Sequence, residues 1–500
     1  MNDRYYLAKL NIVTTLFSKI VVIVCGFIVP RIMIGAFGSE TYGATVSISN
    51  FLAYITLLEG GIGGVARSAL YKPLYDKNLL KVSLILNELN RFFNWIALFF
   101  VAYTIGVAYS FYYVSNITAL NQGETFWLVV VISISTIIQY FIGVKYTILL
   151  QADQRSYVVN VIYMVTTVLN VVVLVILLLF ESNLIMVKLF SSIVYVLRPV
   201  FVYMYVKKEY NLVQCVERSP LEQKWTGMGQ HFAFFMHSNT SVMVLTIFNN
   251  LSSVAVYSVY NMVVSQIENI TKSFTSGIEA LFGNIIAEQN FNELKRIFGY
   301  YELLIHSVST ILFSCTIVLI VQFISLYTKG IVDTEYNVPL FAMVLSITAM
   351  LYCFRLPYHS VIVAIGHFSE TKVAAYGEVL INVFISTILV FEYGLNGVAI
   401  GAMLATAFRF LYYVFYLRDK ILNINLLYFA KRITLNFVDV LVIYYISKYY
   451  IINKIIDSYF EWFKCGFFVF LLSIFVTLFI NIVFYKREMI FLINKIFKRL

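Results

Sequence analysis

A stripe of polar residues runs through one long apolar stretch of the chain, Tyr257 to Glu288. Its six members follow one another at intervals of four, three, four, three and four residues: Asn261, Ser265, Glu268, Lys272, Thr275 and Glu279. On an α-helix this spacing places all six on one face. Three of them carry charge, which at membrane depth costs at least ~2.5 kcal/mol unless it faces water or a partner. The stripe therefore predicts a membrane helix that lines a polar cavity.

A second reading of the stripe is that Glu268 and Lys272, four residues apart, only neutralise each other inside a tight bundle. That reading leaves Glu279 and the uncharged members of the stripe without a role, so the cavity is favoured. A weaker echo of the stripe occurs earlier in the chain. Its members fall on one helical face and are followed by a glycine-rich segment: Thr45, Ser49, Thr56 and Glu59.

The charges predict what such a cavity would bind. Lysine and arginine pair with phosphate oxygens, so a cavity with a net positive charge suits an anionic or phosphate-bearing substrate. The predicted substrate-binding cations are Lys19, Lys272, Arg355 and Arg31. The acids Glu59, Glu268 and Glu279 suit coupling to protons or sodium ions. The predicted polar lining comprises Asn11, Ser18, Thr56, Asn239, Asn261, Ser265 and Thr275.

Other charges inside apolar stretches have a simpler interpretation. Lys145, Lys188 and Arg198 lie within reach of the end of a span, and Arg409 is about two turns from the basic residue Arg418. Long cationic side chains in such places extend their charged ends toward the membrane surface. We therefore expect these four residues to snorkel rather than to bind a ligand.

The composition sets the class of protein. Of 500 residues, 61% are hydrophobic and 12% are charged, and the mean hydropathy is +0.83. These values are typical of a polytopic membrane protein. The formal charge of +10 comes mostly from cations between the apolar spans, which favours orientation signals and lipid contacts over nucleic-acid binding.

Motifs for other chemistry are missing. The five cysteines are scattered without a CxxC pair, so neither a disulfide framework nor a metal site is indicated. The sequence has no phosphate-binding GxxxxGK[ST] loop and no HExxH or GxSxG motif. We therefore expect no cofactor and no enzymatic activity.

The apolar stretches predict an all-α protein with about fourteen transmembrane helices, taking ~20 residues as one crossing. The eleventh and twelfth spans are expected at about Thr371–Phe391 and Leu395–Leu417. The weak echo between the two stripes predicts two pseudo-symmetric six-helix lobes around a central cavity, residues 1–210 and 211–425. Two additional helices are expected in residues 426–500.

The loops predict the orientation. Connectors on one side carry many cations, late examples being Arg418, Lys420, Lys431 and Arg432. Loops on the other side, such as Ser115–Glu124 and Asn249–Ser253, hold no lysine or arginine. Because basic loops stay in the cytoplasm, both termini are expected there.

Four segments together carry a resemblance to a known family. They are Pro30–Gly43 (PRIMIGAFGSETYG), Leu57–Arg67 (LLEGGIGGVAR), Ser253–Tyr260 (SVAVYSVY) and Thr275–Leu294 (TSGIEALFGNIIAEQNFNEL). With them the full-length chain resembles the Wzx-type polysaccharide (O-antigen) flippases of the multidrug/oligosaccharidyl-lipid/polysaccharide (MOP) exporter superfamily.

The resemblance implies a function and a location. It implies a central cavity lined by the first, second, seventh and eighth spans, and alternating access that moves an undecaprenyl-diphosphate-linked oligosaccharide across the bacterial plasma membrane for O-antigen or capsule synthesis. The implied partners are the lipid-linked oligosaccharide, membrane lipids and polysaccharide polymerase or assembly proteins. Members often carry an acid in the seventh span where this chain has Asn239, which leaves the coupling ion open.

Two other functions stay in consideration. A cation-coupled multidrug (MATE-like) exporter shares the superfamily but typically has twelve spans, and the two helices expected after Asn425 argue against it. A membrane-embedded polysaccharide polymerase or glycosyltransferase would usually need a large outer loop or an acidic loop motif, and neither is found.

Overall fold

The computed structural model of the chain describes residues 2–114, 120–212, 228–275, 278–422, 425–449 and 456–490. Within these ranges every regular element is a helix, from α1 (Asn2–Phe37) to α16 (Tyr459–Phe484). Nine of the described helices are long and apolar enough to cross a membrane, and the bent pair of α2 and α3 provides a tenth. The predicted class, an all-α polytopic membrane protein, is confirmed.

The chain forms two compact units, Met1–Phe235 (unit 1) and Met236–Leu500 (unit 2). The division falls inside α9 (Met228–Phe248). The predicted lobe boundaries at residues 210 and 425 stay predictions, and residues 213–227 lie outside the described ranges. The cytoplasmic location of both termini also stays a prediction, and residues 491–500 are not among those described.

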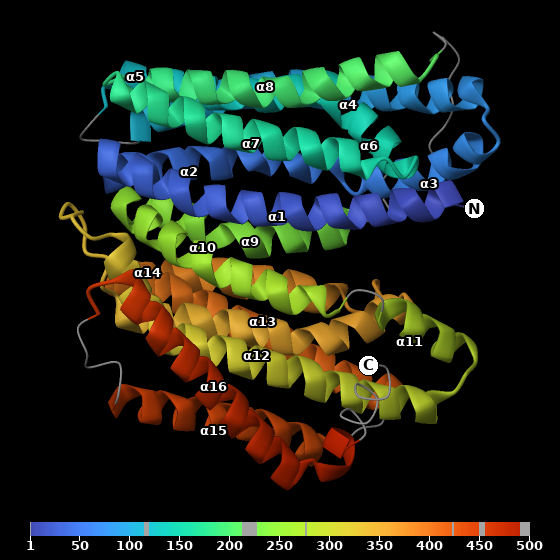
Figure 1. The fold of residues 1–500 in the computed structure, drawn as a ribbon, viewed down its shortest axis with the longest axis vertical. Helices are drawn as coiled ribbons and strands as arrows, with labels where there is room; N and C mark the ends of the chain where they lie inside the picture. Colours follow the sequence, from blue (N-terminus) through green and yellow to red (C-terminus); the bar gives the residue numbers. More distant parts are fainter. Residues whose placement is uncertain are drawn as a thin grey trace. The chain divides into compact units, whose positions relative to one another are not determined.

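Unit 1 is a bundle of long helices that also contains short helical segments, among them a 3₁₀-helix and a π-helix. Helix α7 packs between α1 and α8, and α5 packs between α8 and α4 (Figure 1). After α1 its elements are α2 (Ser39–Ala53), the 3₁₀-helix η1 (Tyr54–Glu59), α3 (Ile62–Tyr75), α4 (Leu79–Val114), α5 (Gln122–Ile138), the π-helix η2 (Gln139–Gly143), α6 (Val144–Ala152), α7 (Ser156–Leu179) and α8 (Leu184–Glu209).

Glycines explain two irregularities in unit 1. Gly60 and Gly61 both have positive φ angles, 53° and 81°, a conformation that suits residues without a Cβ atom. They bend the path from η1 into α3 by 47°. The second membrane span is therefore a broken helix that runs from Ser39 to Tyr75. In η2, a Cβ atom at Gly143 would lie 2.7 Å from the Cβ of Pro199, so glycine allows α8 to approach closely.

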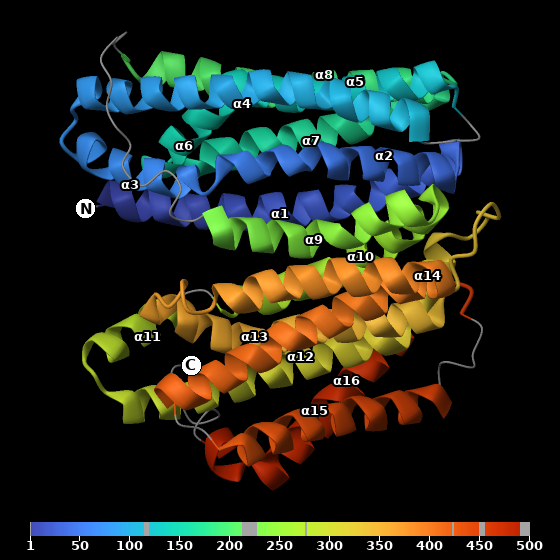
Figure 2. The ribbon, with the colours of Figure 1, turned by 180° about the vertical axis from the view of Figure 1, so that it is seen from behind.

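Unit 2 is built around α12 and α13. Helix α13 packs on α12 and α14, and the last two helices pack on each other and on α12, as the lower part of Figure 2 shows. After α9 its elements are α10 (Leu251–Ser273), α11 (Ile278–Ala287), α12 (Phe291–Tyr327), α13 (Pro339–Ile365), α14 (Lys372–Leu417), the π-helix η3 (Arg418–Leu422), α15 (Leu426–Ser447) and α16.

Helix α14 is a hairpin of two arms. Gly394 breaks it with φ 53° and ψ −126°, and the Ser386 hydroxyl donates a hydrogen bond to the Val398 carbonyl at 3.2 Å. The arms touch so closely that a Cβ atom at Gly401 would lie 2.2 Å from the Ser386 Oγ. The two arms correspond to the predicted eleventh and twelfth spans.

The prediction that Tyr257–Glu288 is one continuous helix is wrong. Helix α10 ends at Ser273, and α11 begins at Ile278. The sequence between them contains threonine, serine and glycine, which are weaker helix formers than alanine, glycine by about 1 kcal/mol. Thr275 and Glu279 therefore do not share one unbroken helical face with Lys272.

Candidate substrate and ion sites

The exposed end of a chain of charges in unit 2 is the pair formed by Lys272 and Glu268 on α10. The Lys272 Nζ lies 3.0 Å from the Glu268 Oε2, and the side chains are 33% and 22% exposed. The Lys272 Nζ also lies 4.5 Å from the ring centroid of Tyr352 on α13, within the range of a cation–π contact. The i,i+4 pairing of the second reading of the stripe is present, and Lys272 remains partly accessible.

The buried end of the same chain of charges is a triad of two arginines around one acid. The Arg355 Nη1 lies 2.7 Å from one oxygen of Glu378, and the Arg409 Nη1 lies 2.6 Å from the other. Glu378 is fully buried, and the two guanidinium side chains are 6% and 7% exposed. Arg409 is therefore paired in the interior, so the expectation that it snorkels is wrong.

Tyr352 connects the two ends. Its ring lies 4.7 Å from the Arg355 guanidinium and 4.5 Å from the Lys272 ammonium. The connected groups contain three cations and two acids, so one positive charge is left over. Because the triad is buried, Lys272 is where this charge can meet an anionic group. We call the five charged residues and Tyr352 the unit 2 charge chain.

Unit 1 contains a polar cavity of about 490 Å³. Its lining comes from η1, α3, α4, α5, η2, α6, α7 and α8 and includes Thr56, Glu59, Gly63, Arg67, Gln139, Tyr140, Gln151, Tyr163, Tyr195 and Arg198. The Tyr140 hydroxyl donates a hydrogen bond to Glu59. Arg67 donates from Nη1 to the Gln151 Oε1 at 2.7 Å. Thr56 and Glu59, which the sequence analysis predicts to face a polar cavity, thus both line this cavity.

Arg198 enters this cavity from α8. Its Nε and Nη2 donate to the hydroxyls of Thr166 and Thr167 at 2.9 and 2.8 Å. Its guanidinium lies 4.2 Å from the ring centroid of Tyr195 and 4.8 Å from that of Tyr163. These contacts hold the charge in the bundle interior, so the expectation that Arg198 snorkels is also wrong.

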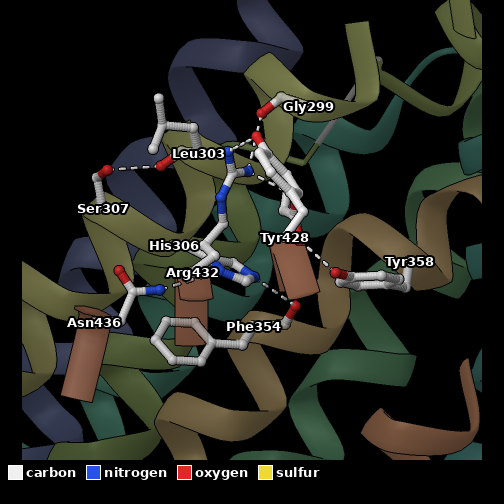
Figure 3. Close-up of polar contacts among 10 residues, drawn as sticks. Gly299, Leu303, His306, Ser307, Phe354, Tyr358, Tyr428, Arg432 and Asn436 are labelled. Atoms are coloured by element: carbon white, nitrogen blue, oxygen red, sulfur yellow. Dashed lines mark hydrogen bonds and ion pairs between the residues drawn. The ribbon is translucent and has the colours of Figure 1, made fainter. Parts of the chain in front are cut away.

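A third cluster ties α15 to the core of unit 2 (Figure 3). The Arg432 Nη1 lies 2.6 Å from the Glu302 Oε2 and donates to the Gly299 carbonyl at 3.1 Å. The hydroxyl of Tyr358 donates to the other oxygen of Glu302, and Arg432 donates to the Tyr428 hydroxyl. Both charged side chains are at most 2% exposed.

The burial of Arg432 corrects its sequence interpretation as a cation of a cytoplasmic loop. Helix α15 already begins at Leu426, so Arg432 lies inside the helix. A signal for this placement is present in the sequence, because Tyr428 and Arg432 are four residues apart and share a helical face. The sequence around Arg432 does not indicate that Glu302 is its partner.

The remaining predicted site residues are more scattered. In unit 1, Lys19 is exposed, Ser18 is buried and Arg31 is half-buried. Asn11 forms hydrogen bonds with the Gln154 carbonyl and the Tyr157 amide at 2.7 and 2.8 Å.

In unit 2, Asn239 and Asn261 are half-buried, and Glu279 is exposed on the first turn of α11. Ser265 and Thr275 donate to carbonyls of nearby residues at 3.2 and 2.7 Å. Their roles in binding stay predictions.

Comparisons with known proteins identify the fold. No family model matches the sequence, and no curated protein matches it. Among solved structures, the lipid II flippase MurJ in an inward closed conformation is 15% identical, with a TM-score of 0.68, over 95% of this chain and 99% of that one.

Two MATE transporters are also similar. An inward-facing MATE family transporter of the MOP superfamily is 14% identical, with a TM-score of 0.61, over 82% of this chain and 98% of that one. A Vibrio cholerae MATE transporter is 15% identical, with a TM-score of 0.55, over 84% and 99%. The chain therefore shares its fold with these transporters, and its long apolar helices indicate a multi-pass membrane protein.

Proposed function

We propose that this protein is a Wzx-type flippase that moves an undecaprenyl-diphosphate-linked oligosaccharide across the bacterial plasma membrane by alternating access, for O-antigen or capsule synthesis. The observation that carries the proposal is the extent of the structural likeness. The lipid II flippase covers 95% of this chain, whereas the two MATE transporters cover 82% and 84%. A fold shared with a flippase over nearly the whole chain favours a lipid-linked cargo.

The unit 2 charge chain supplies the chemistry for such a cargo. A diphosphate carries negative charge and hydrogen-bond acceptors that a lysine ammonium can bind. Lys272 is partly exposed and already held by Glu268 and Tyr352, so little side-chain freedom remains to be lost on binding. On the triad side, the Arg355 guanidinium contacts the ring of Tyr352 and so helps to hold that ring in place. We assign Lys272 the contact with the diphosphate and Arg355 a positioning role.

The acids are assigned to ion coupling. Glu59 lines the unit 1 cavity with its oxygen bonded by Tyr140, and Glu268 is half-buried beside Lys272. A carboxylate in either place changes charge when it binds a proton or a sodium ion, and that change alters the contact with its neighbour. Coupling to a proton or sodium gradient is part of the proposal.

A multidrug exporter is the second candidate, because the structural likeness to this chain covers 98% and 99% of the two MATE transporters. The two functions differ in the charge of their cargo. A cationic drug would be repelled by the excess positive charge around Lys272, whereas a lipid diphosphate would be attracted to it. The charge chain therefore favours the flippase.

The test uses the purified full-length protein in proteoliposomes. One arm follows a labelled undecaprenyl-diphosphate oligosaccharide by its accessibility to an impermeant sugar-modifying reagent, and the other follows a cationic dye. Both arms are run with and without proton and sodium gradients. Protein-dependent movement of the lipid-linked sugar supports the flippase. Gradient-driven dye export without sugar movement would replace it with the drug exporter.

A further inference from the structure

The charge balance of the unit 1 cavity is positive. Its lining residues include two arginines, Arg67 and Arg198, and one acid, Glu59. Among the described residues no carboxylate pairs with either arginine: Arg67 donates to the Gln151 amide oxygen, and Arg198 donates to two threonine hydroxyls. Glu59 is engaged by the Tyr140 hydroxyl. An arginine within a membrane bundle usually has a partner that offsets its charge, and such residues mark binding sites by default.

Two segments that line the cavity are irregular where they face it. The path from η1 to α3 breaks at Gly60 and Gly61, immediately after Glu59. The π-helix η2 carries Gln139 and Tyr140 into the lining. Single π-helical turns and broken membrane helices are common at ligand sites, because they turn polar groups toward a ligand. The regular packing of unit 1 is interrupted around this cavity.

We propose that the unit 1 cavity binds a phosphate-type oxyanion between Arg67 and Arg198. A guanidinium has five N–H donors in a planar fork that matches phosphate oxygens. The contacts of Arg198 use two of these donors and those of Arg67 use one. A cavity of about 490 Å³ has room for the ion together with water. The proposal concerns unit 1 and does not depend on the transported substrate.

The first experiment measures binding to the purified full-length protein in neutral detergent. Inorganic phosphate is titrated against sodium chloride of equal ionic strength while the thermal unfolding midpoint and the heat of binding are followed. A saturable rise in the midpoint with phosphate, absent with chloride, is expected. A parallel arm uses dihexanoyl phosphatidic acid, which separates a free phosphate ion from a phosphate carried by a lipid. No saturable binding of either probe to the wild type would overturn the proposal.

Variants locate the site. Arg198→Gln and Arg67→Gln should each weaken the Kd by roughly 10- to 100-fold, the usual effect of losing a charge-assisted hydrogen bond. Arg155→Gln is the matched control in the same unit, because Arg155 pairs with Asp153 and Glu209 at 3.2 and 3.0 Å and does not line the cavity. Binding that survives in Arg198→Gln but disappears in Lys272→Gln would assign the ion to unit 2 and contradict the proposal.

A second pair of variants keeps every charge in place. A Cβ atom at Gly63 or at Gly64 meets no atom within 4 Å, so both positions accept a side chain. Gly63 lines the cavity, whereas Gly64 is exposed. Gly63→Val should occupy cavity space and weaken phosphate binding, and Gly64→Val should leave the Kd unchanged. Equal Kd values for the two variants would place the ion elsewhere.

Discussion

In unit 2 the guanidiniums of Arg355, Arg409 and Arg432 each meet a carboxylate at 2.6 to 2.7 Å, and all three side chains are buried. In unit 1 the guanidinium of Arg198 meets two threonine hydroxyls and two aromatic rings beside a cavity of about 490 Å³. The two interiors therefore hold their cations in different ways. In unit 2 a carboxylate neutralises each of these arginines, whereas in unit 1 Arg198 faces a cavity and has no carboxylate partner among the described residues.

The difference has a physical consequence for mutation and motion. Removing one partner of a buried ion pair leaves an uncompensated charge and costs about 3–5 kcal/mol, so the paired helices of unit 2 are held in one arrangement. The hydrogen bonds of Arg198 go to uncharged hydroxyls, so the interior of unit 1 can exchange them for water or a ligand without leaving a second buried charge unpaired. We expect unit 2 to be sensitive to loss of a charge and unit 1 to tolerate it.

The largest effect is expected for Glu378→Gln in unit 2. The substitution leaves two buried guanidiniums without their shared carboxylate, so the stability of the protein should fall by about 3–5 kcal/mol. Thermal and denaturant unfolding in detergent measure this loss. Glu392→Gln, at an exposed position of the same helix, is the control. Equal stability of the two variants would show that the triad does not hold unit 2 together.

The Glu302–Arg432 pair allows a finer test. Arg432→Met alone orphans Glu302 and should cost a similar amount, about 3–5 kcal/mol, and should loosen the attachment of α15 to α12. Adding Glu302→Gln removes the orphaned charge, so the double variant should lose less than the sum of the two single variants. Unfolding measurements on all four proteins give the coupling energy. Simple additivity would mean that the two side chains do not interact.

Backbone packing in α14 predicts an intermediate effect. A methyl group at Gly401 would overlap the Oγ and the backbone nitrogen of Ser386, at 2.2 and 2.6 Å, so the arms of the hairpin must separate. We expect Gly401→Ala to cost about 1–3 kcal/mol, as other overpacked sites do. In contrast, a Cβ atom at Gly26 of α1 meets no atom within 4 Å, so Gly26→Ala should unfold at or above the wild-type midpoint. Unfolding of the two variants in parallel checks this prediction.

The smallest of these losses is expected for Arg198→Met in unit 1. The substitution removes hydrogen bonds to two hydroxyls but orphans no acid, so it should cost about 1–2 kcal/mol. Unfolding Arg198→Met and Glu378→Gln under identical conditions tests whether the loss of an interior charged group costs less stability in unit 1 than in unit 2. A loss as large as that of Glu378→Gln would mean that the unit 1 cavity is as tightly coupled to stability as the buried triad.

The sequence predicts the fold class because apolar stretches of membrane length are a strong local signal. The Glu268–Lys272 pair, the less favoured reading of the polar stripe, is also visible in the sequence, since partners four residues apart meet on any helix. The sequence analysis misses the end of α10 after Ser273, where weak helix formers compete with an otherwise apolar pattern.

Contacts between distant residues are what one sequence cannot show. Glu302 and Arg432 are 130 residues apart, and Arg432 stands next to Lys431, so the two look like loop cations. Arg198 and Arg409 look like snorkelling residues for the same reason, because their partners come from other helices or from the opposite arm of a hairpin. Tertiary packing decides whether such a charge reaches the membrane surface or an interior partner.

In the proposed flippase the accessible cation of the unit 2 charge chain, Lys272, meets the diphosphate of a lipid-linked sugar. The most direct measurement is the rate of flipping of the labelled lipid-linked oligosaccharide by Lys272→Met in proteoliposomes, with Lys372→Met at an exposed position as control. Because a partly exposed ion pair contributes at most about 1 kcal/mol, both variants should fold like the wild type. We predict that flipping falls at least tenfold in Lys272→Met and is unchanged in Lys372→Met. Wild-type flipping rates in a folded Lys272→Met protein would show that Lys272 does not bind the diphosphate.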